Sequence, residues 1–87
     1  MSEVVLLSQP TCELCDHAKH ILQRLAPEYG FTLRELSFDS SEGRVLATSH
    51  RLLFAPGVLL DGTPFSYGRL SERRLRRELD RRTDAPS

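Results

Sequence analysis

The stretch "VVLLSQPTCELCDHA" (residues 4–18) decides the fold. It joins an unbroken apolar run to a proline-containing break and then to two cysteines with two residues between them. The apolar run Val4–Leu7 predicts a strand that is buried on both faces, central in its sheet and parallel to a neighbour. Cys12 and Cys15 are the only cysteines of the sequence, so this stretch also carries its strongest chemical signal.

A helix is expected to begin at the cysteine pair. Apolar residues recur at helical spacing along one face, namely Leu14, Ala18, Ile21, Leu22 and Leu25. Cys15 borders this face, whereas Cys12 lies off it. Pro27 has no backbone N–H to donate within a helix, so we expect the helix to end there.

The remaining chain alternates strands and helices. It predicts a strand over 31–38 at a sheet edge, a short helix over 42–50, a hairpin over 58–67 and a last helix from Ser71 to about residue 82. The apolar residues expected inside are Val45, Leu46 and Leu53 for the short helix, and Leu75 and Leu79 for the last one. This order predicts an α/β domain with a four-stranded mixed sheet and three helices.

Length and composition describe one small domain. The sequence has 87 residues, 39% hydrophobic and 28% charged, with a formal net charge of zero. We therefore expect a single domain over 1–87, with residues 82–87 as a frayed tail. No run approaches the roughly 20 apolar residues of a membrane span, and no secretory signal is recognisable. We expect a cytoplasmic monomer that does not bind membranes.

The place of the cysteine pair at the start of a helix predicts how each cysteine reacts. At the start of a helix, unpaired N–H groups and the positive end of the dipole favour a thiolate at Cys12. Cys15, one turn further on, is placed to attack the mixed disulfide that Cys12 forms. Glu13 and Asp16 add negative charge near this thiolate, which predicts a reducing dithiol rather than a strong oxidant.

Two other interpretations compete with disulfide exchange. Cys12, Cys15, His17 and His20 form a Cys₂His₂ set by count, although three of the four share one helix and typical zinc sites are spaced further apart. An iron–sulfur cluster shared between two protomers would need one cysteine per chain and glutathione. The arginine-rich stretch 69–82 favours a solvated helix over a nucleic-acid surface, because acidic residues interrupt it. No metal ligand and no nucleic-acid contact are therefore predicted.

The sequence resembles the glutaredoxin-like branch of the thioredoxin superfamily over residues 3–82. The resemblance lies in "VVLLSQPTCELCDHA" and in "FAPGVLLDGTPFSYGRLSERRL" (residues 54–75). It implies a thioredoxin-like fold of the glutaredoxin type, in the order βαβαββα. In this family a proline opens the third strand after a cis peptide bond, and Pro56 matches that position. The backbone of Ala55 would then bind an extended substrate.

The resemblance also implies an activity: a thiol–disulfide oxidoreductase that reduces protein or small-molecule disulfides by a dithiol mechanism, in electron transport and cell redox homeostasis. The catalytic residues would be Cys12 and Cys15, and the substrate-binding residues Gln9, Thr11, Ala55, Pro56, Gly68 and Arg69. No cofactor would be bound, and glutathione or thioredoxin reductase would supply electrons. Partners would be disulfide-containing proteins or glutathione. The alternative is a non-catalytic thioredoxin-fold module that binds zinc or an iron–sulfur cluster.

Overall fold

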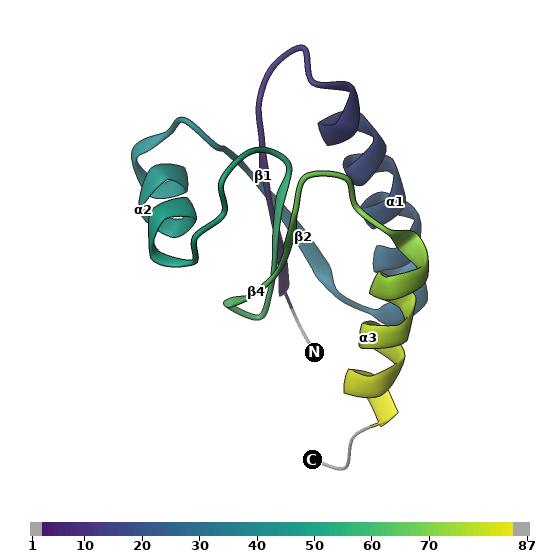
Figure 1. Ribbon diagram of the computed structural model, residues 1–87. Coiled ribbons are helices and arrows are strands. Elements are labelled where there is room, and N and C mark those ends of the chain that lie inside the picture. The colour runs from purple at the N-terminus through teal and green to yellow at the C-terminus, as the bar shows by residue number, and fades with distance from the viewer. Residues whose placement is uncertain (1–2, 85–87) are drawn as a thin grey trace.

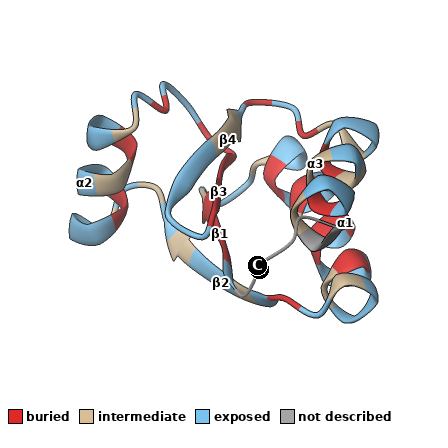
Figure 2. Cartoon of the chain, turned by 90° about the horizontal axis from the view of Figure 1, so that it is seen from below, coloured by how far each residue is buried: buried red, intermediate tan, exposed pale blue. Residues whose placement is uncertain are grey.

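The structure is a computed structural model that describes residues 3–84, a sheet with helices on both faces (Figure 1). Its elements are β1 (Glu3–Ser8), α1 (Glu13–Tyr29), β2 (Thr32–Ser37), α2 (Ser41–Ser49), β3 (Gly57–Leu60), β4 (Thr63–Tyr67) and α3 (Glu72–Asp84). The predicted order βαβαββα is confirmed. Seen from below, α2 covers one face of the sheet while α1 and α3 cover the other (Figure 2).

The sheet has the strand order β2-β1-β3-β4. β1 pairs in parallel with β2 and antiparallel with β3, and β3 pairs antiparallel with β4. The central position predicted for Val4–Leu7 and the edge position predicted for the second strand are both confirmed. The hairpin turns at Asp61 (φ 48°) and Gly62 (φ 81°), and two consecutive positive φ angles are what a tight two-residue hairpin requires.

Two apolar clusters lie on the two faces of the sheet. Alternate residues of β1 point to opposite faces, so Val4 and Leu6 enter one cluster while Val5 and Leu7 enter the other. The larger cluster, under α1 and α3, also contains Ala18, Ile21, Leu22, Leu25, Phe31, Val58, Leu60, Leu70, Leu75 and Leu79. The smaller one, under α2, also contains Ala47, Leu52 and Leu59. The predicted burial of Leu75 and Leu79 is confirmed.

The prediction that Pro27 ends the first helix is wrong. α1 continues through Pro27 to Tyr29 and ends at Gly30, which has φ 74° and donates its N–H to the Ala26 carbonyl oxygen over 2.8 Å. A left-handed glycine is the usual residue just after a helix. Pro27 removes only one hydrogen bond of the helix, the one to the Gln23 carbonyl oxygen, and α1 continues past it.

The predicted core face of α2 is also wrong. α2 buries Gly43 and Ala47, whereas Val45 is 63% exposed and Leu53 is 69% exposed. A Cβ added at Gly43 would lie 2.0 Å from the Ser37 carbonyl oxygen. The helix lies so close to the end of β2 that only small residues fit beneath it. Of the three apolar residues predicted to be buried by this helix, only Leu46 is partly buried.

Ion pairs join α3 to the second half of α1. The Arg76 guanidinium donates to Glu28 over 2.6 Å and to Glu72 over 3.0 Å, and Arg24 also donates to Glu72 over 2.6 Å. The hydrogen bonds from Arg24 and then from Arg76 hold the pKa of Glu72 below its usual value. Arg76 therefore belongs to a surface network between helices, as expected for a solvated last helix.

The last helix begins where it was predicted and runs slightly further. The Ser71 hydroxyl oxygen accepts the Arg74 N–H over 3.2 Å, which is an N-terminal cap. α3 ends at Asp84, two residues beyond the predicted end, so 82–84 are helical rather than a frayed tail. Residues 85–87 of that predicted tail lie outside the described residues. Within 3–84 no helix is both long and apolar enough to cross a bilayer.

Candidate active site

Cys12 and Cys15 are joined by a disulfide bond at the start of α1, with their Cα atoms 5.2 Å apart. Cys12 is the residue that caps the helix, with φ −120° and ψ 107°. Its sulfur accepts the Cys15 backbone N–H over 3.1 Å, and its carbonyl oxygen accepts the Asp16 N–H over 3.0 Å. The Cys15 N–H, which would otherwise be unpaired, is thus directed at the Cys12 sulfur at the start of the helix, where the sequence predicted Cys12 to lie.

The two cysteines differ in their access to solvent. Cys15 is only 3% exposed, on the buried face of α1, while Cys12 is partly exposed. The loop before them turns sharply at Thr11, whose φ is 50° and whose hydroxyl donates to the Pro10 carbonyl oxygen over 2.7 Å. Cys12 is therefore the sulfur that an incoming molecule reaches.

The Ala55–Pro56 peptide bond is cis, as the family resemblance implied. In the sheet, Leu7 lies opposite Gly57, and Gly57 lies opposite Tyr67. Pro56 therefore enters the sheet at the end of β1 that leads to the cysteines. The Gly68 N–H donates to the Pro56 carbonyl oxygen over 2.8 Å, which ties this proline to the end of β4. Ala55, Pro56 and Gly68 thus gather at the cysteine end of the sheet.

Gly68 has a structural reason to be glycine. Its φ is 79°, a conformation that other residues rarely adopt, and a Cβ there would lie 3.0 Å from the Phe54 ring. The Phe54 ring also contacts Tyr67 edge-on, with ring centroids 5.0 Å apart. The backbone of Gly68 therefore packs directly under an aromatic side chain.

Gln9 and Arg69 line different hollows of the surface. Gln9 donates to Asp39 over 3.3 Å and lines a hollow of about 450 Å³ that also includes Asp16 and Glu35. Arg69 lines a second hollow, of about 420 Å³, together with His17, Ser71, Glu72 and Arg73. The two predicted substrate-binding residues do not share one pocket, and the hollow beside Gln9 contains acidic side chains.

Glu35 is the best-defined charge on the Gln9 side. The Ser8 hydroxyl donates to its carboxylate over 2.8 Å, and the Lys19 ammonium lies 3.1 Å from it. The hydrogen bond from Ser8, helped by Lys19, holds the pKa of Glu35 below its usual value. Glu35 is therefore a carboxylate at neutral pH and adds to the negative charge of this side of the site.

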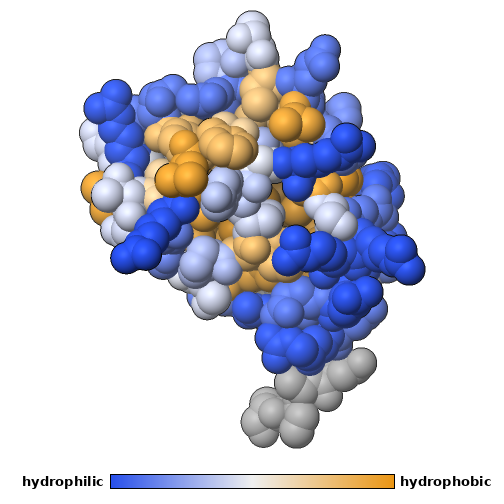
Figure 3. All heavy atoms as spheres, in the orientation of Figure 1, coloured by the Kyte–Doolittle hydropathy of each residue, from blue (hydrophilic) through white to orange (hydrophobic). Residues whose placement is uncertain are grey.

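Several apolar residues around the site are exposed, and the sequence did not predict their exposure. Leu14, predicted to be core, is 41% exposed between the two cysteines, and Phe54 and Tyr67 are 56% and 41% exposed. Phe54 directly precedes Ala55, and Tyr67 directly precedes Gly68, so proximity to the family motifs was the available signal. Figure 3 shows apolar side chains gathered over the upper part of this view, the end at which α1 begins in Figure 1.

The alternative of a metal site gains no support from the geometry. Within residues 3–84, no three His, Cys, Asp or Glu side chains converge as metal ligands would. His17 and His20 are both exposed on α1, while Cys15 faces the core. These side chains therefore point to different surroundings.

A thioredoxin-like fold, with a Cys-x-x-Cys pair capping its first helix and a cis proline at the same end of the sheet, defines a protein of the thioredoxin superfamily with a redox-type site. The chain belongs to the family described as "Glutaredoxin-like domain (DUF836)", whose pattern matches residues 3–80. No curated protein matches it significantly.

Solved thioredoxins share this fold. A mutant thioredoxin from Halobacterium salinarum NRC-1 superposes with a TM-score of 0.73 at 17% identity, over 98% of this chain and 77% of that one. Thioredoxin O2 from Arabidopsis thaliana, in its oxidized state, superposes with a TM-score of 0.68 at 14% identity, over 91% of this chain and 72% of that one. At these identities the likeness concerns the fold.

Proposed function

We propose that this protein is a thiol–disulfide oxidoreductase that reduces disulfides of proteins or small molecules through Cys12 and Cys15. One observation carries the proposal: the partly exposed Cys12 sulfur accepts an N–H of the first turn of α1, while its disulfide partner is buried. Such hydrogen bonds become stronger when the sulfur is negatively charged, and the helix dipole acts in the same direction. The site is therefore suited to hold a thiolate at Cys12.

The reaction proceeds by two exchanges. The Cys12 thiolate attacks one sulfur of the substrate disulfide, a bond forms between them, and the other substrate sulfur leaves as a thiolate that takes up a proton. Cys15 then loses its proton and attacks the Cys12 sulfur. The bond from Cys12 to the substrate breaks, which releases the second substrate thiolate and leaves the Cys12–Cys15 disulfide. Two electrons have passed from the dithiol to the substrate.

The surroundings of the pair favour a reducing role. Glu13 and Asp16 lie in the first turn of α1, where their negative charge opposes the stabilisation of the Cys12 thiolate by the helix. A less stabilised thiolate corresponds to a less oxidising disulfide. We therefore infer that the protein donates electrons. We further propose that it does so as a monomer in the cytoplasm, in electron transport and cell redox homeostasis.

The remaining predicted residues would bind the substrate. The backbone of Ala55, before Pro56, would pair with an extended substrate segment, and Gly68 and Arg69 would complete that side. Thr11 and Gln9 would border the other side. We infer that the electron donor is glutathione or thioredoxin reductase, and that the partners are disulfide-containing proteins or glutathione itself.

Insulin reduction with two alternative donors tests the proposal. The protein is supplied either with glutathione, glutathione reductase and NADPH or with thioredoxin reductase and NADPH, and NADPH oxidation is followed. Wild type is expected to turn over with one donor, and Cys12→Ser is expected to show none. Cys15→Ser is expected to accumulate a mixed disulfide with its substrate, visible on a non-reducing gel. Absence of turnover with both donors, together with no trapped species, would contradict the proposal.

A further inference from the structure

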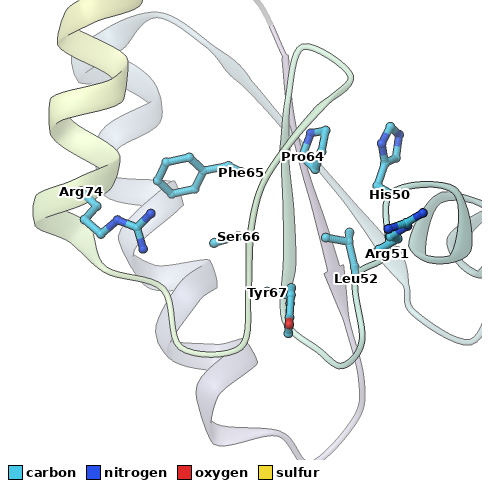
Figure 4. Close-up of a pocket in the computed structure, with 8 residues that line it drawn as sticks. All are labelled: His50, Arg51, Leu52, Pro64, Phe65, Ser66, Tyr67 and Arg74. Carbon is cyan, nitrogen blue, oxygen red and sulfur yellow. The ribbon is translucent and has the colours of Figure 1, made fainter.

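A groove runs along the outer edge of β4, and neither Cys12 nor Cys15 lines it. It encloses about 340 Å³ and is lined by His50, Arg51, Leu52, Pro64, Phe65, Ser66, Tyr67 and Arg74. Figure 4 shows Arg74 of α3 on one side of β4 and the segment that follows α2 on the other. Among residues 3–84, only β3 pairs with β4, so the floor of the groove is an open strand edge.

The walls of the groove are basic on both sides. His50 and Arg51 stand on one side and Arg74 on the other, and none of the eight lining residues is acidic. Within the described part of the chain, neither Arg51 nor Arg74 takes part in an ion pair, in contrast to Arg76, two residues further along α3. The Arg74 guanidinium lies instead 5.9 Å from the centre of the Phe65 ring. These cations are available to an anionic ligand.

Arg51 occupies a position where glycine is the usual residue. Its φ is 57°, and it follows α2 in a Schellman motif: Arg51 N–H donates to Thr48 over 3.3 Å and Leu52 N–H donates to Ala47 over 2.8 Å. A side chain in this left-handed conformation is strained, and strained residues are concentrated at functional sites. The chain therefore holds a strained arginine at the rim of the groove where an unstrained residue would end the helix equally well.

The floor of the groove offers backbone hydrogen bonds. Gly68 directs its N–H to Pro56, on the β3 side. Because N–H and C=O groups of successive residues in a strand point to opposite edges, those of Tyr67 point to the open side. An extended segment lying in the groove can pair with them, as peptides do when they add a strand to a sheet.

We propose that β4 binds an extended acidic segment of a partner protein as a fifth strand. Successive side chains of such a strand point to opposite faces of the sheet. Neighbouring carboxylates of the segment then meet Arg74 on one face and Arg51 and His50 on the other. The two-sided arrangement of cations fits an alternating chain better than one compact anion. The inference goes beyond the redox function and requires no step of cysteine chemistry.

A titration with a synthetic peptide tests the groove. The probe is the capped heptapeptide Val-Glu-Glu-Val-Glu-Glu-Val, added to the full-length ¹⁵N-labelled protein while amide shifts are followed by NMR. We expect the largest shifts at Phe65, Ser66 and Tyr67. Arg51→Gly and Arg74→Gln are each expected to weaken binding by about 2- to 5-fold, the range of one partly exposed ion pair. Arg77→Gln, an exposed change on α3 outside the groove, is the matched control and is expected to bind as wild type.

The same titration distinguishes this proposal from others. A peptide with lysine in place of glutamate, or with proline at alternate positions, is expected to bind more weakly than the probe. Equal binding of the lysine peptide, shifts confined to Cys12, Cys15 and the first turn of α1, or inorganic phosphate that saturates the groove with equal affinity would each overturn the proposal. The double variant Cys12→Ser, Cys15→Ser is expected to bind the probe normally, so failure of the redox function leaves this test unaffected.

Discussion

Replacing Gly43 by alanine should destabilise the protein, although alanine favours helices by about 1 kcal/mol over glycine. The new Cβ would lie 2.0 Å from the Ser37 carbonyl oxygen and 3.1 Å from that of Phe38. Both atoms belong to the backbone, so the start of α2 has to move away by about an ångström. Such overpacking costs about 1–3 kcal/mol. The shift also breaks the Ser40 cap, whose hydroxyl accepts the Gly43 N–H over 3.0 Å, for about 1 kcal/mol more.

The two losses, less the gain of about 1 kcal/mol in helix propensity, leave a net loss of about 1–3 kcal/mol, a large part of the stability of a domain of this size. Urea unfolding followed by far-ultraviolet circular dichroism measures it, with Thr48→Ala as a control at an exposed position of the same helix. The control is expected to change stability by less than about 0.5 kcal/mol. A Gly43→Ala variant as stable as wild type would refute the close approach of α2 to the end of β2.

Three further outcomes are expected. Under reducing conditions, Cys12→Ser should be about 1 kcal/mol more stable than Cys12→Ala, because an oxygen can still accept the Cys15 N–H; equal urea midpoints would argue against the cap. In the folded state the pKa of Glu35 is lowered, chiefly by the hydrogen bond from Ser8. The Glu35 carboxylate should therefore stabilise the protein at pH values above its ordinary pKa of 4.5, and this contribution should be lost on acidification. The difference in urea midpoint between wild type and Glu35→Gln should accordingly shrink from about pH 7 to about pH 3. Arg51→Gly should raise stability by about 0.5–1 kcal/mol in calorimetry, because glycine adopts the positive φ without strain; a lowered midpoint would contradict this.

Strong local patterns predicted most of the fold. Four consecutive apolar residues, Val4–Leu7, are all buried because β1 is central and both of its faces are covered. The pair Asp61-Gly62 predicted the hairpin for the same kind of reason, since few residue types tolerate its backbone angles. In these places the local preference and the tertiary structure agree.

The errors lie where tertiary contacts override local preference. Pro27 is a sound signal to stop a helix, yet the turn after it is held by contacts to α3: Glu28 pairs with Arg76, and the Tyr29 hydroxyl donates to Asp80 over 2.8 Å. In α2, the close approach of the helix to the sheet excludes large side chains, so the apolar Val45 points outward. Neither contact is visible in a local pattern.

In the candidate site, too, some features were predicted by local sequence patterns and others were not. The position of Cys12 at the start of a helix followed from the helical spacing of the apolar residues after it and from the strand before it. The cis bond before Pro56 was implied only by resemblance to a family, because a sequence does not show which isomer is present. The left-handed Arg51 had no local signal at all, since glycine or asparagine is usual there.

The links between α1 and α3 divide the first helix into two unequal parts. Arg24, Glu28 and Tyr29 are all attached to α3, whereas Lys19, nearer the sulfur atoms, pairs with Glu35 of β2. The C-terminal half of α1 is therefore anchored to a second helix, and its N-terminal turns are held less firmly. Local opening of α1 should therefore be concentrated at the cysteine end. We expect the amide hydrogens of its first turns to exchange with solvent sooner than those of its last turns.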